Sequence, residues 1–140
     1  MDDVEVVTAI CEALAMAGVG QWRPAGPGYS ASEVGIFYGA IGSTPDLAIG
    51  VTLYAAGDPI GEGAPDRFVQ VRSRGDRGAP HGADRLAGAV FRALHGTHHT
   101  GGIARIARTS TAHLGADENG RQERTDNYRI ILNPAPGGTP

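Results

Sequence analysis

The sequence predicts an α+β fold, with two helices packed on one face of a mainly antiparallel sheet of about five strands. Two segments have apolar residues at the three- and four-residue spacing of helices, whereas several others alternate with the two-residue period of strands. Their order is one helix, three strands, a second helix and two strands. This order is typical of helices that cover one side of an antiparallel sheet.

Size and composition indicate one domain. The 140 residues are 41% hydrophobic, which allows a core, and the 22 glycines and nine prolines indicate many turns and long loops. The C-terminal residues are mainly Pro and Gly and lack large apolar side chains. We therefore expect a single α+β domain over residues 1–133 and a disordered tail over residues 134–140.

The first helix is expected over residues 3–17. Asp2 or Asp3 can cap its N-terminus, and Gly18 follows its end. Its apolar stripe consists of Val4, Val7, Cys11 and Leu14. The next segment, residues 18–32, is too rich in Gly and Pro for regular structure, and Trp22 is expected to anchor it on apolar neighbours.

Three strands are expected between the helices, within residues 33–42, 44–57 and 67–75. The second shows the clearest alternation, with one apolar set on a single face, namely Leu47, Ile49, Val51 and Leu53. In the third, Val69 and Val71 are expected to point inward, so Gln70 and Arg72 point outward.

A second helix is expected over residues 82–96, followed by a hairpin. The apolar stripe of the helix consists of Ala83, Leu86, Ala87, Val90, Phe91 and Leu94. Residues 101–115 favour extended structure, although Ile103 and Ile106 are not expected to share a strand face. The Asn119-Gly120 pair then turns the chain into a last strand, which has Tyr128, Ile130 and Leu132 on one face.

Charge and hydropathy argue against several classes of protein. The formal net charge of −3 disfavours a nucleic-acid binder that relies on phosphate attraction. No signal peptide is visible and no apolar run approaches 18 residues, so we expect a soluble protein made in the cytoplasm, with no membrane partner. All twelve cations are arginines, whose planar groups suit bidentate pairing with carboxylates.

We predict neither an enzyme nor a metal or cofactor site. His95, His98 and His99 lie beyond a helix end in a Gly-flanked loop without an acidic neighbour, so solvated histidines are the simpler interpretation. A small metal-dependent enzyme that uses these histidines is the alternative. The Gly-rich runs lack P-loop and dinucleotide-binding spacing, and Cys11, the only cysteine, is expected to be a buried thiol.

The most charged stretch is residues 114–132, around the Asn119-Gly120 turn. It contains seven candidate interface residues of both signs, namely Asp117, Glu118, Arg121, Glu123, Arg124, Asp126 and Arg129. They either decorate a solvated hairpin, where surface pairs contribute about 0–1 kcal/mol each, or select a partner at a subunit boundary. Charge alone leaves both interpretations open.

Three segments together resemble a known family. They are the strand FVQVRSRG, the helix GADRLAGAVFRALHG and the ending LGADENGRQERTDNYRIIL. Their order and spacing resemble small proteins catalogued as minor capsid or tail-terminator proteins of long-tailed phages, especially phages of actinobacteria. With GIFYGAI and PDLAIGVTLY, the resemblance covers roughly residues 34–133.

The resemblance implies a virion structural protein that forms a hexameric ring. Such a ring caps the tail tube, ends its polymerisation and docks on the head connector, while DNA passes through the lumen without specific binding. The implied partners are copies of the chain itself, the tail-tube protein and a head–tail connector or stopper protein. The implied location is the virion tail at the head–tail junction, after assembly in the host cytoplasm.

The seven charged residues are then candidates for the subunit interface. Three alternatives remain besides the enzyme. They are a neighbouring stopper or adaptor of the head–tail connection, a minor capsid protein, and a monomeric binding module with a merely solvated hairpin.

Overall fold

The computed structural model describes residues 1–96 and 101–134, which form two helices and six strands. Residues 135–140 of the predicted tail lie outside this range. The elements are α1 (Asp3–Met16), β1 (Gln21–Trp22), β2 (Gly35–Tyr38), β3 (Ala48–Gly57), β4 (Asp66–Arg77), α2 (Gly82–Leu94), β5 (Ile103–Ala116) and β6 (Arg121–Leu132). No described helix combines the length and hydropathy needed to cross a membrane.

The strands form one mixed sheet in the order β1-β2-β3-β4-β6-β5. β1 and β2 pair in parallel, as do β2 and β3, and the remaining neighbours are antiparallel. The predicted α+β fold with a mainly antiparallel sheet is confirmed, with one strand more than expected. The extra strand, β1, lies in the segment predicted to be irregular, where Trp22 packs against the core and the Gln21 N–H donates to Val34 O at 2.8 Å.

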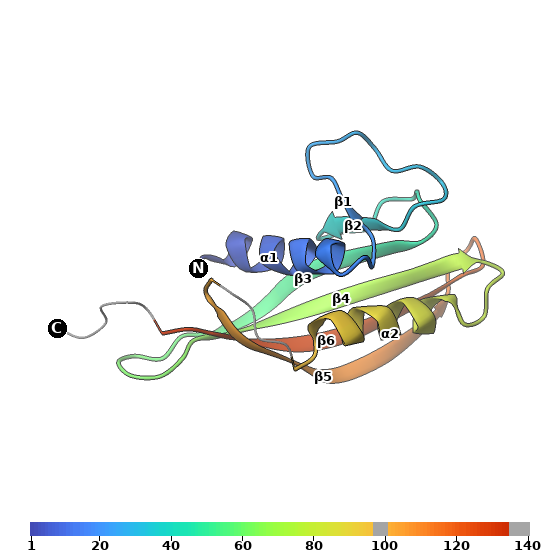
Figure 1. Cartoon of the computed structure of the whole chain (residues 1–140). Coiled ribbons are helices and arrows are strands. Elements are labelled where there is room, and N and C mark those ends of the chain that lie inside the picture. The colour runs from blue at the N-terminus through green and yellow to red at the C-terminus, as the bar shows by residue number, and fades with distance from the viewer. Residues whose placement is uncertain (97–100, 135–140) are drawn as a thin grey trace.

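Both helices pack on the same face of the sheet (Figure 1). α1 lies over β1, β2 and β3, whereas α2 lies over β4 and β6. One continuous core fills the space between the layers, and it includes the inward-facing apolar residues predicted for the strands, such as Ile49, Val51, Val69, Val71 and Ile130. The opposite face of the sheet carries no described helix, so this face is open.

α1 begins with a reciprocal cap. The Glu5 N–H donates to Asp2 Oδ1 at 2.8 Å, and the Asp2 N–H donates to Glu5 Oε1 at 3.1 Å. The buried stripe is Val6, Val7, Ile10, Cys11 and Leu14. The prediction that Val4 belongs to this stripe was wrong, because Val4 lies beyond its edge and is 59% exposed. The predicted buried thiol is confirmed, because Cys11 is fully buried, and this burial raises the pKa of the thiol to about 12.

A bulge in β5 places on one face two residues that a regular strand would place on opposite faces. Ile103 pairs with Leu132 and Arg105 pairs with Ile131, so Ala104 is the extra residue between them. As a result, Ile103 and Ile106 are both buried in the core. The prediction that they cannot share a face was wrong, because it assumed an unbroken two-residue period.

Tyr128 is fully buried on β6, yet its hydroxyl has no hydrogen-bond partner in the described chain. Burial raises the pKa of this hydroxyl, and the nearby Asp126 carboxylate raises it further.

We expect Tyr128→Phe to change the free energy of unfolding by less than about 1 kcal/mol, or to increase it, because it removes an unsatisfied polar group. Tyr128→Ala, which removes the ring, should cost about 3–5 kcal/mol. Urea unfolding measures both, and a loss above about 2 kcal/mol in the Phe variant would reveal a partner for the hydroxyl.

Candidate functional site

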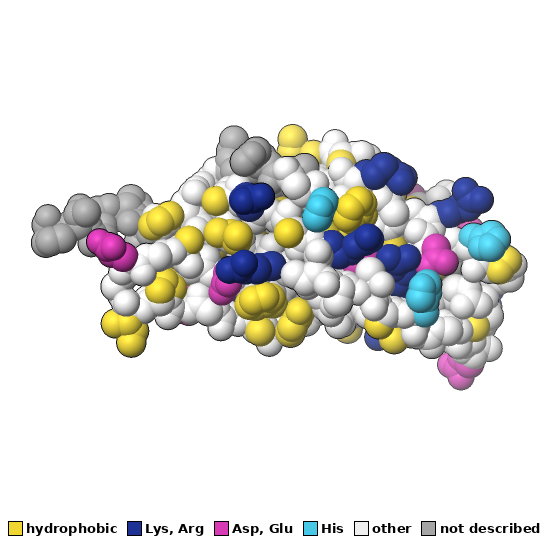
Figure 2. Space-filling view, turned by 90° about the horizontal axis from the view of Figure 1, so that it is seen from below, with side chains coloured by type: hydrophobic (Ala, Val, Ile, Leu, Met, Phe, Trp, Pro, Cys, Tyr) yellow, Lys and Arg dark blue, Asp and Glu magenta, His cyan; other side chains and the backbone are white. Residues whose placement is uncertain are grey.

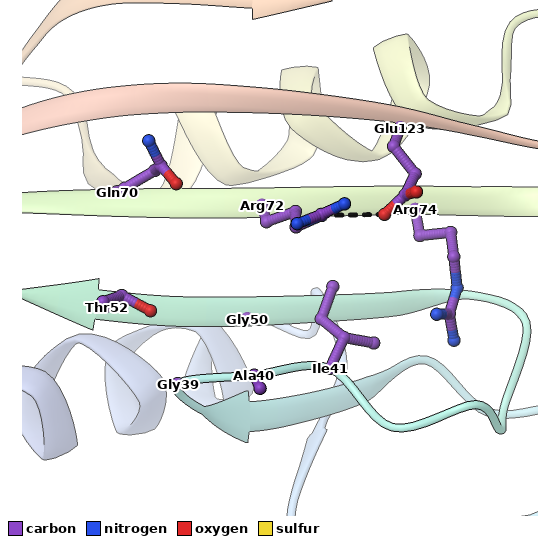
Figure 3. Close-up of a pocket in the computed structure, with 9 residues that line it drawn as sticks. All are labelled: Gly39, Ala40, Ile41, Gly50, Thr52, Gln70, Arg72, Arg74 and Glu123. Atoms are coloured by element: carbon purple, nitrogen blue, oxygen red, sulfur yellow. Dashed lines mark hydrogen bonds and ion pairs between the residues drawn. The ribbon is translucent and has the colours of Figure 1, made fainter. Parts of the chain in front are cut away.

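The open face of the sheet is hollowed beside the loop that connects β2 to β3. A pocket of about 330 Å³ lies there (Figure 3). Its lining residues are Gly39, Ala40, Ile41, Gly50, Thr52, Gln70, Arg72, Arg74 and Glu123. A Cβ atom on Gly50 would lie only 2.5 Å from Gly39 O, so the glycine lets the loop rest directly on β3.

One ion pair crosses the pocket from strand to strand. Arg72 on β4 and Glu123 on β6 point toward each other, with the Arg72 Nε–H donating to Glu123 Oε1 at 2.7 Å (Figure 3). The Arg72 side chain is 47% exposed. Water therefore screens this pair, and its contribution to stability is small.

Arg74 fixes the loop between β2 and β3 to the sheet. Its guanidinium donates to three backbone carbonyl oxygens of the loop, those of Gly42 at 2.8 Å, Pro45 at 2.8 Å and Asp46 at 2.9 Å. Arg74 is buried, and this burial lowers the pKa of its guanidinium. The side chain therefore holds residues 39–47 in place.

Arg121, the first residue of β6, holds the same loop from a second strand. Its Nη1 donates to Ser43 O at 2.8 Å and to Asp46 Oδ1 at 3.0 Å, and its Nε donates to Asp117 Oδ2 at 2.8 Å. Asp117 in turn accepts the N–H groups of Asn119 and Arg121 at 2.9 Å each. The carboxylate thus forms the Asn119-Gly120 turn and positions the buried guanidinium.

A second group of charges lies on the helix-covered face. Arg124 Nε donates to Asp126 Oδ1 at 2.8 Å, and Arg124 Nη1 donates to Asp84 Oδ1 on α2 at 3.2 Å. Arg108 on β5 lies 3.5 Å from the other carboxylate oxygen of Asp126, which is 1% exposed. These pairs join α2 to the strands beneath it.

His95 also joins α2 to the sheet. Its ring stacks on Phe91 with 4.6 Å between centroids, and its Nδ1 accepts the Arg108 N–H at 3.0 Å. The Arg108 guanidinium also lies over the Phe91 ring, 4.0 Å from its centre. His95 therefore has a structural role at the helix end. His98 and His99 lie outside the described residues, within which no group of three possible metal ligands occurs.

Arg23 connects the two ends of the Gly/Pro-rich segment after α1. Its guanidinium pairs with Glu33 and lies 5.0 Å from the centre of the Tyr29 ring. The Tyr29 hydroxyl donates to Ile36 O at 2.6 Å, which ties the segment to β2. The hydrogen bond from Arg23, followed by that from the Ser30 N–H, lowers the pKa of the Glu33 carboxyl to about 2.

The structure separates the seven charged hairpin residues into three groups. Arg121, Glu123 and Arg129 lie on the open face, Arg124 and Asp126 lie under α2, and Asp117 and Glu118 form the turn. Six of them form ion pairs within the subunit, including Arg129 with Asp66 at 2.9 Å, whereas Glu118 has none among the described residues. Their assignment to a subunit interface stays a prediction.

Sequence reasoning missed Arg74 and Asp46 as functional neighbours of the hairpin. The strand period places Arg74 on the outer face, where an arginine is unremarkable. Asp46 is far from Arg121 in the sequence, and no local pattern connects them. The one available signal was the Ser-Thr-Pro-Asp turn, whose backbone carbonyl groups need donors.

Two arginines on β4 allow a matched comparison. Arg74→Ala should lower the free energy of unfolding by about 2–4 kcal/mol, because one buried and two half-buried carbonyl groups lose a charged donor. Arg72→Ala, two residues away on the same face, should cost less than about 1 kcal/mol. Urea unfolding of the two variants gives the difference, and equal losses would contradict the role assigned to Arg74.

The carboxylates that bind Arg121 should make the fold sensitive to acid. The Arg121 N–H is the largest cause that lowers the pKa of Asp117 below its ordinary 3.8. For Asp46, burial opposes the shift, but hydrogen bonds from Arg77 and Arg121 still lower its pKa. Lowered pKa values mean stabilisation that is present above about pH 4 and is lost as the pH falls through the folded-state values.

Asp117→Asn should therefore be less stable at neutral pH and lose less stability between about pH 5 and pH 3 than the original chain. Urea midpoints at the two pH values test this, and parallel losses would contradict it.

Comparisons with known proteins agree with this fold. A family model described as "Bacteriophage tail terminator protein" matches residues 13–134. A chain in a solved structure titled "Virion of native gene transfer agent (GTA) particle" is similar with a TM-score of 0.50 and 15% identity, over 69% of this chain and 77% of that chain. This similarity shows a shared fold. A search of curated proteins finds no match. Because the family model extends from the last turn of α1 past the end of β6, this chain belongs to the bacteriophage tail terminator family and is a structural protein of the virion tail.

Proposed function

We propose that this protein is a tail terminator whose copies form a hexameric ring at the head-proximal end of the tail tube. The ring stops the addition of tube subunits and joins the finished tube to the head connector. The observation that carries the proposal is the family match over residues 13–134. The fold shared with a chain of a gene transfer agent virion supports a structural role.

The proposed ring requires a heterologous contact, in which one surface of the subunit meets a different surface of the next. The hairpin charges are proposed to contribute to this contact through their exposed members, Glu118 and Arg129. The buried members have another role, because Arg121 and Asp126 are already paired inside the subunit. Reversing the charge of Arg121 would therefore damage the subunit itself and is not a clean test of assembly.

DNA is proposed to pass through the lumen without specific binding. A subunit with a net charge of −3 has no overall excess of cations that would retain phosphates. No catalytic, metal or cofactor role is proposed for any residue. The protein acts by shape and by contact with copies of itself, the tube protein and the connector.

Light scattering after size exclusion tests the ring, with the protein alone and with the tail-tube protein of the same phage. We expect a particle with the mass of six subunits, either alone or only on the tube, because marginal interfaces can need a template. We also expect tubes grown with the protein to stop at shorter lengths than tubes grown without it, as seen by electron microscopy. A monomer that ignores the tube and leaves its growth unchanged would refute the proposal.

A further inference from the structure

The loop between β3 and β4, residues 58–65, projects from the body of the subunit as an arm (Figure 1). Ile60 lies entirely in solvent, with a relative exposure of 104%. Glu62 is also exposed and has no ion-pair partner in the described part of the chain. In Figure 2, the end of the molecule that carries the arm, on the left, shows hydrophobic and acidic side chains at its surface. The arm therefore presents an isoleucine and a carboxylate that the subunit itself does not use.

Two arginines fix the base of the arm. On β4, Arg67 Nη1 donates to Asp58 Oδ1 at 2.7 Å, and Arg67 Nε donates to Asp3 Oδ1 of α1 at 2.9 Å. On the neighbouring strand β6, Arg129 Nε donates to Asp66 Oδ2 at 2.9 Å. A projecting loop that is held at its base in this way loses less conformational entropy when a partner binds it. The arm is thus built to insert into another surface.

A groove of about 280 Å³ lies between the end of α1 and the second half of α2. Its lining is apolar apart from one guanidinium, and consists of Ala17, Gly18, Val19, Ala89, Arg92 and Ala93. Arg92 is exposed and forms no ion pair within residues 1–96 and 101–134. Met16, the residue before the groove in the sequence, is 90% exposed. An exposed methionine next to small apolar side chains is typical of a surface that another protein covers.

The arm and the groove of one subunit lie too far apart to meet. Asp3, at the start of α1, binds Arg67 at the base of the arm, whereas the groove lies beyond the end of the same helix. A helix of 14 residues is about 21 Å long. Figure 1 also shows the arm directed away from α2 and from the end of α1. The arm of one copy reaches a groove only when a second copy is placed head to tail with it.

We infer that the arm of each subunit docks in the α1–α2 groove of the next subunit, with Ile60 against its alanines and Glu62 beside Arg92. This inference rests on the ring proposed above and names one of its contacts. Burial of the isoleucine supplies the affinity, and the opposite charges of Glu62 and Arg92 fix the orientation. Two arms or two grooves do not complement each other. The contact is therefore heterologous, and it favours a closed ring over symmetric pairs.

Disulfide trapping tests the contact directly. Cys11 is buried, so added cysteines can be read without interference from it. The test chain combines Ile60→Cys on the arm with Ala17→Cys, an exposed position of the groove. Oxidation after assembly on the tube protein should give a covalent ladder that ends at six subunits on a denaturing gel. Each single variant should give no ladder. The matched control combines Ile60→Cys with Thr111→Cys, which is exposed on β5 outside the groove, and should also give none.

Substitutions measure the two parts of the contact by light scattering with the tube protein present. Ile60→Ser should need at least about tenfold more protein to form the ring, because the buried apolar surface is lost. The control Val4→Ser, which removes an exposed apolar side chain of α1, should assemble like the original chain. Glu62→Arg and Arg92→Glu should each weaken assembly about threefold or more, and the two combined should recover it. Circular dichroism checks that every variant is folded.

The outcomes separate the contact from the ring. If the original chain forms the ring but the double-cysteine chain gives no ladder, or if Ile60→Ser assembles like the original, the inferred contact is wrong while the ring stands. If Ile60→Ser forms the ring normally but no longer attaches to the tube, the arm binds the tube protein and the inference is again overturned. If the original chain forms no ring even on the tube, the proposed function itself fails.

Discussion

The fold of the subunit depends on two buried guanidinium groups, which donate hydrogen bonds to a loop that no neighbouring strand binds. β2 and β3 are parallel neighbours, and the short connection between them, residues 39–47, returns across the open face of the sheet without a helix. A loop in this position has backbone carbonyl groups that accept no hydrogen bond from a neighbouring strand. Where such groups are buried, they need donors from elsewhere. Arg74 and Arg121 supply the donors for four successive parts of the loop, at Gly42, Ser43, Pro45 and Asp46. These hydrogen bonds connect the loop between the parallel strands β2 and β3 to the antiparallel strands β4 and β6.

Arginines paired with aspartates suit this arrangement. A guanidinium presents several donors in a fixed plane and remains charged when it is buried, so one side chain can satisfy several carbonyl groups at once. A buried cation needs a nearby anion, and Arg121 has Asp117 on its own turn and Asp46 in the loop it holds. The same principle applies on the other face, where Arg124 and Arg108 surround the buried Asp126. Most of the charge in residues 114–132 therefore specifies the shape of the subunit.

Periodicity in the sequence predicted the two helices and the long strands because each buries one regular apolar face. It failed where the period is interrupted or too short to detect, at the bulge beside Ala104 and in the two residues of β1. The charged residues of the hairpin were identified from the sequence, but their partners were not. Arg121 binds residues 75 and 78 positions away, and Arg124 binds Asp84, 40 positions away. Such partners follow from the topology, which the local pattern does not encode, and the family resemblance supplied the functional expectation that the residues alone left open.

A subunit that satisfies most of its charges internally has few left for assembly, and this has a physical consequence for the ring. Exposed ion pairs contribute about 0–1 kcal/mol each, so a lateral contact that depends on the few remaining charges would be weak for a single pair of subunits. Closure of a ring and attachment to a tube add further contacts at once, and each added contact raises the effective concentration of the next. Weak lateral contacts would therefore suit the proposed terminator, whose ring would close mainly at a tube end. The internal pairing of the hairpin charges thus fixes the shape of the subunit, and the proposed ring would gain its stability from the contacts that closure and the tube add together.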